Sequence, residues 1–119
     1  MNAPRILEAT CTLELWEASA LTAGDRALLE AAHAAVERAY APYSGFRVGA
    51  ALRLANGTII TGTNQENAAY PSGMCAERVA LFQAGSVHPG VAVEALAVAS
   101  DGQAHWESFS PCGGCRQVI

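Results

Sequence analysis

The chain has 119 residues, enough for one small domain and too few for an additional domain of the dinucleotide-binding type. Hydrophobic residues make up 51% of it and charged residues only 15%, which excludes intrinsic disorder and suggests that another subunit covers part of the surface. Seven arginines, no lysine and eleven acidic residues give a net charge of −4, so we do not expect a nucleic acid as a partner.

Residues 1–21 are expected to form a poorly defined leader, in which Thr10–Leu15 alternates weakly like a short strand. The leader lacks the basic start and apolar stretch of a signal peptide, and no run in the chain approaches the roughly 20 apolar residues of a membrane span. We therefore expect a cytoplasmic protein without a membrane partner. Because cytosolic thiols stay reduced, the four cysteines are expected to be ligands or nucleophiles rather than disulfide partners.

The first half of the domain reads as a helix followed by a β-hairpin. Thr22 is a suitable N-cap, and apolar residues then recur at helical spacing, which predicts a helix over 23–40 that stops before a proline. Apolar residues alternate with small or polar ones over 46–54, as in a strand. Asn56-Gly57 is a strong hairpin signal, and it predicts that 58–64 returns as the partner strand.

The second half adds a helix, a strand and the start of a last helix. Residues 75–84 predict a helix closed by Gly85 in the C-cap position. The apolar run 91–100 is typical of a strand buried on both faces. Pro111 then precedes a helix that starts at about Cys112, with the proline near its first position. The order predicts a mixed α/β sandwich.

Three of the four cysteines carry the clearest chemical signal. Cys75 begins a predicted helix, and Cys112 and Cys115 form a C-x-x-C pair at the start of another. A catalytic zinc site takes three protein ligands and leaves the fourth position to water, and helix N-termini favour thiolates. Glu77 lies two residues past Cys75, where its carboxylate could reach that open position. The pattern indicates a zinc site that activates water.

Two other interpretations of these cysteines remain open from the residues alone. A redox C-x-x-C pair is one, but it leaves Cys75 and Glu77 without a role. A structural zinc site is the other, and it requires a fourth protein ligand. The candidates for that ligand are Cys11, His33, His88 and His105.

The ligand-x-Glu and P-C-x-x-C elements occur together in zinc deaminases. In the three-cysteine version found here, the chain resembles the homotetrameric cytidine deaminases that act on free nucleosides, within the cytidine/deoxycytidylate deaminase superfamily. The segments that carry this resemblance are Pro42-Tyr43-Ser44-Gly45-Phe46-Arg47-Val48-Gly49-Ala50-Ala51, Asn64-Gln65-Glu66-Asn67-Ala68-Ala69-Tyr70, Cys75-Ala76-Glu77-Arg78 and Ser110-Pro111-Cys112-Gly113-Gly114-Cys115-Arg116-Gln117.

The resemblance implies a three-layer α/β/α sandwich with a mixed sheet, assembled as a homotetramer. It implies one Zn²⁺ per chain on Cys75, Cys112 and Cys115, with Arg78 hydrogen-bonded to the thiolates. It also implies hydrolysis of cytidine and deoxycytidine to uridine, deoxyuridine and ammonia, in pyrimidine salvage. Glu77 would move protons from the attacking water to N3 of cytosine and then to the departing amine.

The resemblance further implies how the nucleoside is held. Asn64 and Glu66 would bind the ribose 3′-hydroxyl, and alternate residues of a strand do point to the same side. Phe46 would lie against the pyrimidine ring, as aromatic pairs do. Tyr70 would reach the site of a neighbouring subunit, and Ala76 would be a further substrate contact.

Two alternative functions accompany this interpretation. The first is deamination of a modified cytosine nucleoside such as blasticidin S, which shares the zinc motifs. The second is a non-catalytic, zinc-stabilised interaction domain, against which Glu77 argues because a structural site has no use for a proton-shuttling carboxylate.

The deaminase-like domain is expected to span 22–119 and to be incomplete at its C-terminus. Ile119 lies four residues past Cys115, which leaves the last helix about one turn. The resembling family continues with further strands and a C-terminal helix. We therefore expect the natural protein to be longer.

Overall fold

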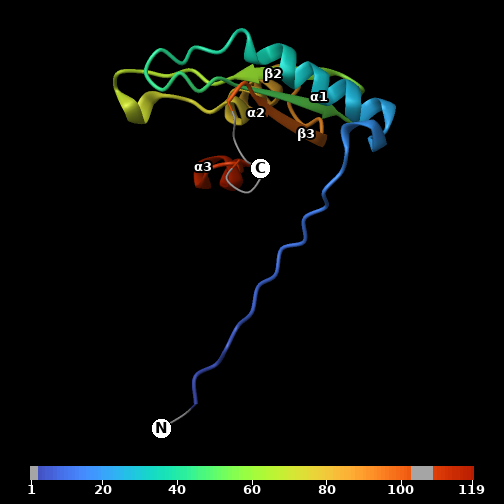
Figure 1. The fold of residues 1–119 in the computed structure, drawn as a ribbon, viewed down its shortest axis with the longest axis vertical. Coiled ribbons are helices and arrows are strands. Elements are labelled where there is room, and N and C mark those ends of the chain that lie inside the picture. The colour runs from blue at the N-terminus through green and yellow to red at the C-terminus, as the bar shows by residue number, and fades with distance from the viewer. Residues whose placement is uncertain (1–2, 103–108) are drawn as a thin grey trace.

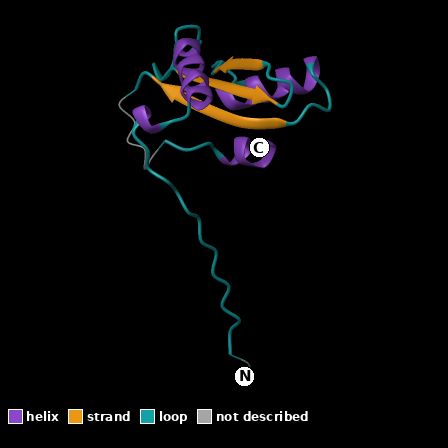
Figure 2. Cartoon of the chain, turned by 90° about the vertical axis from the view of Figure 1, so that its right-hand side faces the viewer, coloured by secondary structure: helices purple, strands orange, loops and turns teal. Residues whose placement is uncertain are grey.

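A three-stranded sheet organises the computed structural model, which describes residues 3–102 and 109–119 (Figure 1). The elements, in chain order, are η1 (Ala18–Ala20), α1 (Ala23–Val36), β1 (Val48–Leu54), β2 (Ile59–Thr63), η2 (Tyr70–Ser72), α2 (Ala76–Val87), β3 (Val93–Ser100) and α3 (Gly113–Val118). The strand order is β2-β1-β3, so β1 lies in the middle. Residues 3–17 extend away from the rest of the described chain (Figures 1 and 2).

Both pairings in the sheet are antiparallel. Leu52 of β1 lies opposite Ile60 of β2 on one side and Leu96 of β3 on the other. The predicted hairpin is confirmed, and the Gly57 N–H closes its turn by donating to the carbonyl of Leu54. The α/β class is therefore confirmed, whereas the mixed sheet is not found among the described strands, because each neighbour runs antiparallel to β1.

The alternation of side chains along β1 places one helix on each face of the sheet. Leu52 and Leu54 pack with Ala80 of α2 in one buried cluster, and Ala51 packs with Ala32 of α1 in the other. This arrangement confirms the three layers that the sequence implied.

Small residues bring α1 very close to the sheet. Alanines make up much of the buried core, and Gly49 faces α1. A Cβ atom at Gly49 would lie only 2.2 Å from the carbonyl oxygen of Ala32, a distance that no packing tolerates. The glycine is therefore required by the closeness of the helix to the central strand.

Helix boundaries differ from the predictions where backbone contacts outweigh local pattern. The N-cap at Thr22 is confirmed, since its side chain accepts from the N–H of Asp25. However, α1 ends at Val36 rather than Tyr40, because the Tyr40 backbone bonds to the segment after β2. Gly85 was expected to close α2, but the helix continues to Val87, since this glycine keeps a negative φ and no left-handed cap forms there.

Two segments differ from what their sequences predict. β3 was expected to be buried on both faces, yet Val93 is 42% exposed, because β3 is an outer strand of the described sheet. Thr10–Leu15 forms no strand and is exposed.

Pro111 lies just before α3 rather than at its first position, since Cys112 is the N-cap. Among the described residues, no helix has the length and hydropathy needed to cross a membrane.

Candidate metal centre and adjoining cavity

The N-termini of α2 and α3 bring three thiols together. Cys75 is the N-cap of α2, Cys112 is the N-cap of α3, and Cys115 lies buried one turn into α3. All three Sγ atoms lie within 4.8 Å of one another. The predicted cluster is thus assembled from two separate parts of the chain, with two of its thiols at helix N-termini.

The spacing of the thiols fits zinc. The Sγ atoms of Cys75 and Cys112 are 3.8 Å apart. Thiolates about 2.3 Å from a tetrahedral zinc ion are separated by about 3.8 Å, the edge of that tetrahedron. All cysteines are free thiols, and the three in the cluster form the single group of metal-ligating side chains found in residues 3–102 and 109–119. Three soft donors with one position left open suit a zinc ion that also binds water.

The environments of the two cysteines in the C-x-x-C pair differ. Hydrogen bonds from the backbone and thiol of Cys115 lower the pKa of Cys112 to about 7. Burial raises the pKa of Cys115 to about 12, although Arg78 opposes this effect. One thiolate of the pair therefore forms near neutral pH, while the buried thiol requires a cation to ionise.

Arg78 supplies positive charge next to the thiols. Its Nη2 atom donates to Cys75 Sγ at 3.6 Å, and contacts with Cys75 and Cys115 raise its pKa above the usual range. Gly114 lies beside the guanidinium, since a Cβ atom there would be in ordinary van der Waals contact with Arg78 Cζ, at 3.6 Å. The Nε atom of Arg78 is buried and has no hydrogen-bond partner in the part of the chain that the structure describes. An arginine with an unused buried donor suits a site that gathers negative charge when three thiolates bind a metal.

Glu77 lies in the first turn of α2 and is only 6% exposed. Burial and the hydrogen bond with Cys112 raise the pKa of Cys115 most, and the charge of the Glu77 carboxylate raises it further, which places that charge close to the thiols. The side chain of Ala76, by contrast, packs into the core. Any contact of Ala76 with a ligand would therefore come from its backbone.

A cavity of about 660 Å³ adjoins the thiol cluster. Its walls include six residues named from the sequence: Asn64, Glu66, Tyr70, Cys75, Arg78 and Cys112. Phe46, Ala76, Glu77 and Cys115 are not among its lining residues. The structure thus unites most of the predicted site, and a cavity of this size is typical of small-molecule sites.

Backbone pairing brings the segment after β2 to this cavity. Gln65 pairs with Met74, immediately before Cys75, through hydrogen bonds of 2.9 and 2.8 Å. On the other side, Tyr40 accepts from Glu66 N–H and donates to the Asn64 carbonyl. The segment carrying Asn64 and Glu66 is therefore held between the end of α1 and the start of α2.

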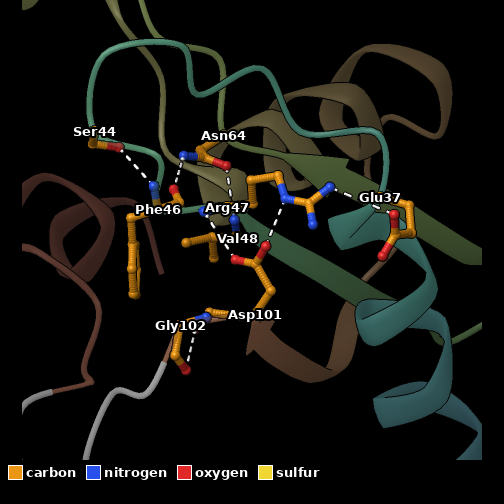
Figure 3. A network of polar contacts seen from close by, with 9 residues as sticks. Glu37, Ser44, Phe46, Arg47, Val48, Asn64, Asp101 and Gly102 are labelled. Carbon is orange, nitrogen blue, oxygen red and sulfur yellow. Dashed lines mark hydrogen bonds and ion pairs between the residues drawn. The ribbon is translucent and has the colours of Figure 1, made fainter.

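The side chain of Asn64 also bonds to the backbone where β1 begins (Figure 3). Its Oδ1 accepts from Val48 N–H at 2.8 Å, and its Nδ2 donates to the Phe46 carbonyl at 2.9 Å. These bonds leave one amide hydrogen and one lone pair of Asn64 for a ligand.

Phe46 faces away from Asn64 and toward the chain around Gly102 (Figure 3). Its ring meets Phe109 edge-on, with centroids 6.2 Å apart and planes at 66°. The start of β1 is further fixed by Arg47, whose Nε atom lies 2.6 Å from Asp101 Oδ2.

Other predicted candidates lie apart from the cluster. Cys11 is exposed in the leader, His33 is in α1, and His88 is the C-cap of α2. His105 lies outside the described residues.

Two residues make polar contacts at the site that were not predicted from the sequence. Ser44 bonds to Glu66, and Arg116 donates to the Pro111 carbonyl and the Ser110 hydroxyl, bracing the turn before Cys112. Both residues lie inside the motif segments. The Ser44-Gly45 pair is a turn signal that could have drawn attention to the first contact.

Comparisons with known proteins agree with this geometry. Residues 22–119 match the family described as the cytidine and deoxycytidylate deaminase zinc-binding region. A cytidine deaminase of Sporosarcina psychrophila is 54% identical over 84 residues, which are 70% of this chain and 58% of that relative. A cytidine deaminase of Halalkalibacterium halodurans is 48% identical over 92 residues, 77% of this chain and 67% of that protein.

Solved structures extend the likeness to the fold. The crystal structure of cytidine deaminase from Burkholderia pseudomallei matches with a TM-score of 0.71 and 48% identity, over 82% of this chain and 74% of that one. This chain therefore spans 58% of the length of its Sporosarcina relative and about three quarters of a solved neighbour. From its family match, its relatives and its assembled thiol cluster, the chain belongs to the cytidine and deoxycytidylate deaminase zinc-binding family.

Proposed function

We propose that this chain catalyses the hydrolytic deamination of cytidine and deoxycytidine, releasing ammonia and forming uridine and deoxyuridine. The observation that carries the proposal is the group of three thiols, close enough to hold one ion, beside the buried carboxylate of Glu77. Relatives named cytidine deaminase, up to 54% identical, support the substrate class. The deaminase domain is proposed to span residues 22–119.

Cys75, Cys112 and Cys115 would hold the zinc ion, and Arg78 would offset their charge through its contact with Cys75. When bound, the zinc ion supplies a Lewis acid that makes a water molecule nucleophilic at neutral pH. Glu77 would take one proton from that water and give it to N3 of the cytosine ring as the oxygen adds to C4. It would then take the second proton from the hydroxyl now on C4 and give it to the amine, which leaves as ammonia while the C4 carbonyl forms. Its burial next to the thiols excludes competing solvent from this transfer.

The remaining motif residues would orient the nucleoside. Asn64 and Glu66 line the cavity with hydrogen-bonding capacity to spare, which suits a sugar hydroxyl. Phe46 and the backbone of Ala76 would contact the pyrimidine, and Tyr70, which is 91% exposed, would reach a neighbouring subunit.

We also propose that the enzyme is a cytoplasmic homotetramer that acts in pyrimidine salvage. The low charged fraction of 15% and the exposed aromatic ring of Phe82, at 50%, support a surface covered by other subunits.

Side-by-side turnover tests the substrate. Zinc-loaded protein is incubated separately with cytidine, deoxycytidine, blasticidin S and free cytosine, and ammonia release is followed. The proposal requires that both nucleosides react and that cytosine reacts very poorly, because a site built for a sugar hydroxyl leaves polar groups unpaired without it. Faster release from blasticidin S than from cytidine would favour the modified-nucleoside alternative.

A further inference from the structure

Glu66 is tied to the loop before β1 through both of its carboxylate oxygens. Oε2 accepts the backbone N–H groups of Tyr43 and Ser44, at 2.9 and 3.1 Å. Oε1 accepts the Ser44 hydroxyl. Ser44 thus contacts this carboxylate by its backbone and its side chain together.

The Ser44 hydroxyl also fixes the turn that carries Phe46. Its oxygen accepts the Phe46 N–H at 3.0 Å while its hydrogen goes to Glu66 (Figure 3 draws the former bond). Gly45 permits the turn, since its φ of +67° is in the left-handed region, and its N–H donates to the Ala41 carbonyl at 3.0 Å. One hydroxyl therefore connects the end of the β2 segment with the chain that enters β1.

Counting acceptor sites shows what this arrangement leaves for a ligand. A carboxylate offers about four lone-pair sites. The two N–H groups use both sites on Oε2, and the hydroxyl uses one on Oε1, so Glu66 keeps a single acceptor site. That site belongs to the oxygen whose orientation Ser44 sets.

We propose that Ser44 is a positioning residue, whose hydroxyl holds the Glu66 carboxylate so that its remaining acceptor site meets one sugar hydroxyl of the nucleoside. The inference rests on the proposed function, since it assigns Glu66 to the sugar. Ser44 lines the same cavity but acts through Glu66.

The choice of variants follows from the exposure of Ser44. Ser44→Ala removes the hydroxyl and keeps the backbone bonds. Ser44→Thr keeps the hydroxyl, and its extra methyl group has room because Ser44 is exposed. Ser86, an exposed serine in α2, provides the matched control as Ser86→Ala.

Kinetics on the zinc-loaded full chain is the first measurement. Loss of a hydrogen bond to a charged group predicts that Ser44→Ala raises the KM for cytidine about ten-fold while kcat changes less than two-fold. Ser44→Thr should restore the wild-type KM, and Ser86→Ala should match the wild type. In a Glu66→Ala background, Ser44→Ala should change KM no further, because the group that it positions is gone.

The kinetic outcomes separate the two proposals. The positioning role would be overturned if Ser44→Ala left the KM for cytidine unchanged. It would also be overturned if Ser44→Ala lowered kcat by as large a factor as it raised KM and Ser44→Thr did not restore kcat. Either result would leave the deaminase function in place. If the zinc-loaded wild type fails to deaminate cytidine, the function itself is overturned.

A measurement without substrate then tests the hydrogen bond between the Ser44 hydroxyl and the Glu66 carboxylate. The hydrogen bond from the Ser44 side chain lowers the pKa of Glu66 more than any other cause. Titration of the Glu66 carboxyl by carbon NMR should therefore give a pKa below the ordinary glutamate value in wild type and a higher one in Ser44→Ala. Equal pKa values in the two proteins would show that Ser44 does not hold this carboxylate.

Discussion

Gly62 of β2 lies directly against Ala80 of α2, with no room for a side chain between them. A Cβ atom at Gly62 would be 2.5 Å from the Ala80 nitrogen and equally close to the carbonyl oxygen of Ala76. Since α2 begins just after Cys75, this contact sets the distance of the metal centre from the sheet.

The first prediction is that Gly62→Ala forces α2 away from the sheet. Overpacking of this kind costs about 1–3 kcal/mol of the free energy of unfolding, measured by urea denaturation. The control is Gly85→Ala within α2, where the added Cβ meets nothing within 4 Å and stability should rise slightly. Equal stabilities of the two variants would show that the close approach is not required.

A second prediction concerns the core. Leu52 is one of the largest fully buried side chains, in the centre of β1. Leu52→Ala should lower the free energy of unfolding by about 2–5 kcal/mol, because it leaves a cavity between β1 and α2. Leu7, at 80% exposure, is the control, and Leu7→Ala should change stability by less than about 0.5 kcal/mol. A small loss in Leu52→Ala would mean that this cluster is not the core.

A third prediction tests the metal ligands. Cys112→Ser should reduce zinc from near one ion per chain to a small fraction, measured by elemental analysis after dialysis, because a three-ligand site cannot spare one thiolate. Cys11→Ser should keep the full amount, since Cys11 is exposed and outside the cluster. Zinc retention in Cys112→Ser would assign the metal to other residues.

A fourth prediction isolates the proton transfer. Glu77→Gln keeps the size of the side chain and removes its basicity, so it should bind zinc normally while kcat falls at least about a hundred-fold. Glu30→Gln on the exposed face of α1 is the matched control and should retain full turnover. If Glu77→Gln remains active, another group moves the proton.

Local signals in the sequence were sufficient for the elements that depend on local chemistry. The Thr22 cap and the Asn56-Gly57 turn are confirmed, because each is formed by residues within three positions of one another. The thiol cluster could also be anticipated, since zinc chemistry demands thiolates at such spacing. The end of α1 could not, because Tyr40 leaves the helix to bond with a segment more than twenty residues away.

The hydrogen bonds that Asn64 and Glu66 make within the protein depend on tertiary structure. Asn64 and Glu66 were assigned to a sugar. Nothing in their spacing indicated that Glu66 would also bind the backbone of the loop before β1, or that Asn64 would bind the backbone at the start of that strand. Likewise, the exposure of Val93 reflects its place on an outer strand rather than its apolar neighbours. These features depend on which segments lie next to each other in the fold, and the periodicity of apolar residues does not indicate which segments those are.

The central proposal is that this chain deaminates a cytosine nucleoside, with three cysteine thiols holding a zinc ion and Glu77 transferring the protons. The most direct test incubates purified protein with cytidine, quantifies ammonia and uridine, and determines zinc in the same sample. The account predicts equal amounts of ammonia and uridine, at a rate that follows the zinc content and disappears when a chelator removes the metal. Ammonia release at full rate from zinc-free protein, or none from protein holding one zinc per chain, would contradict it.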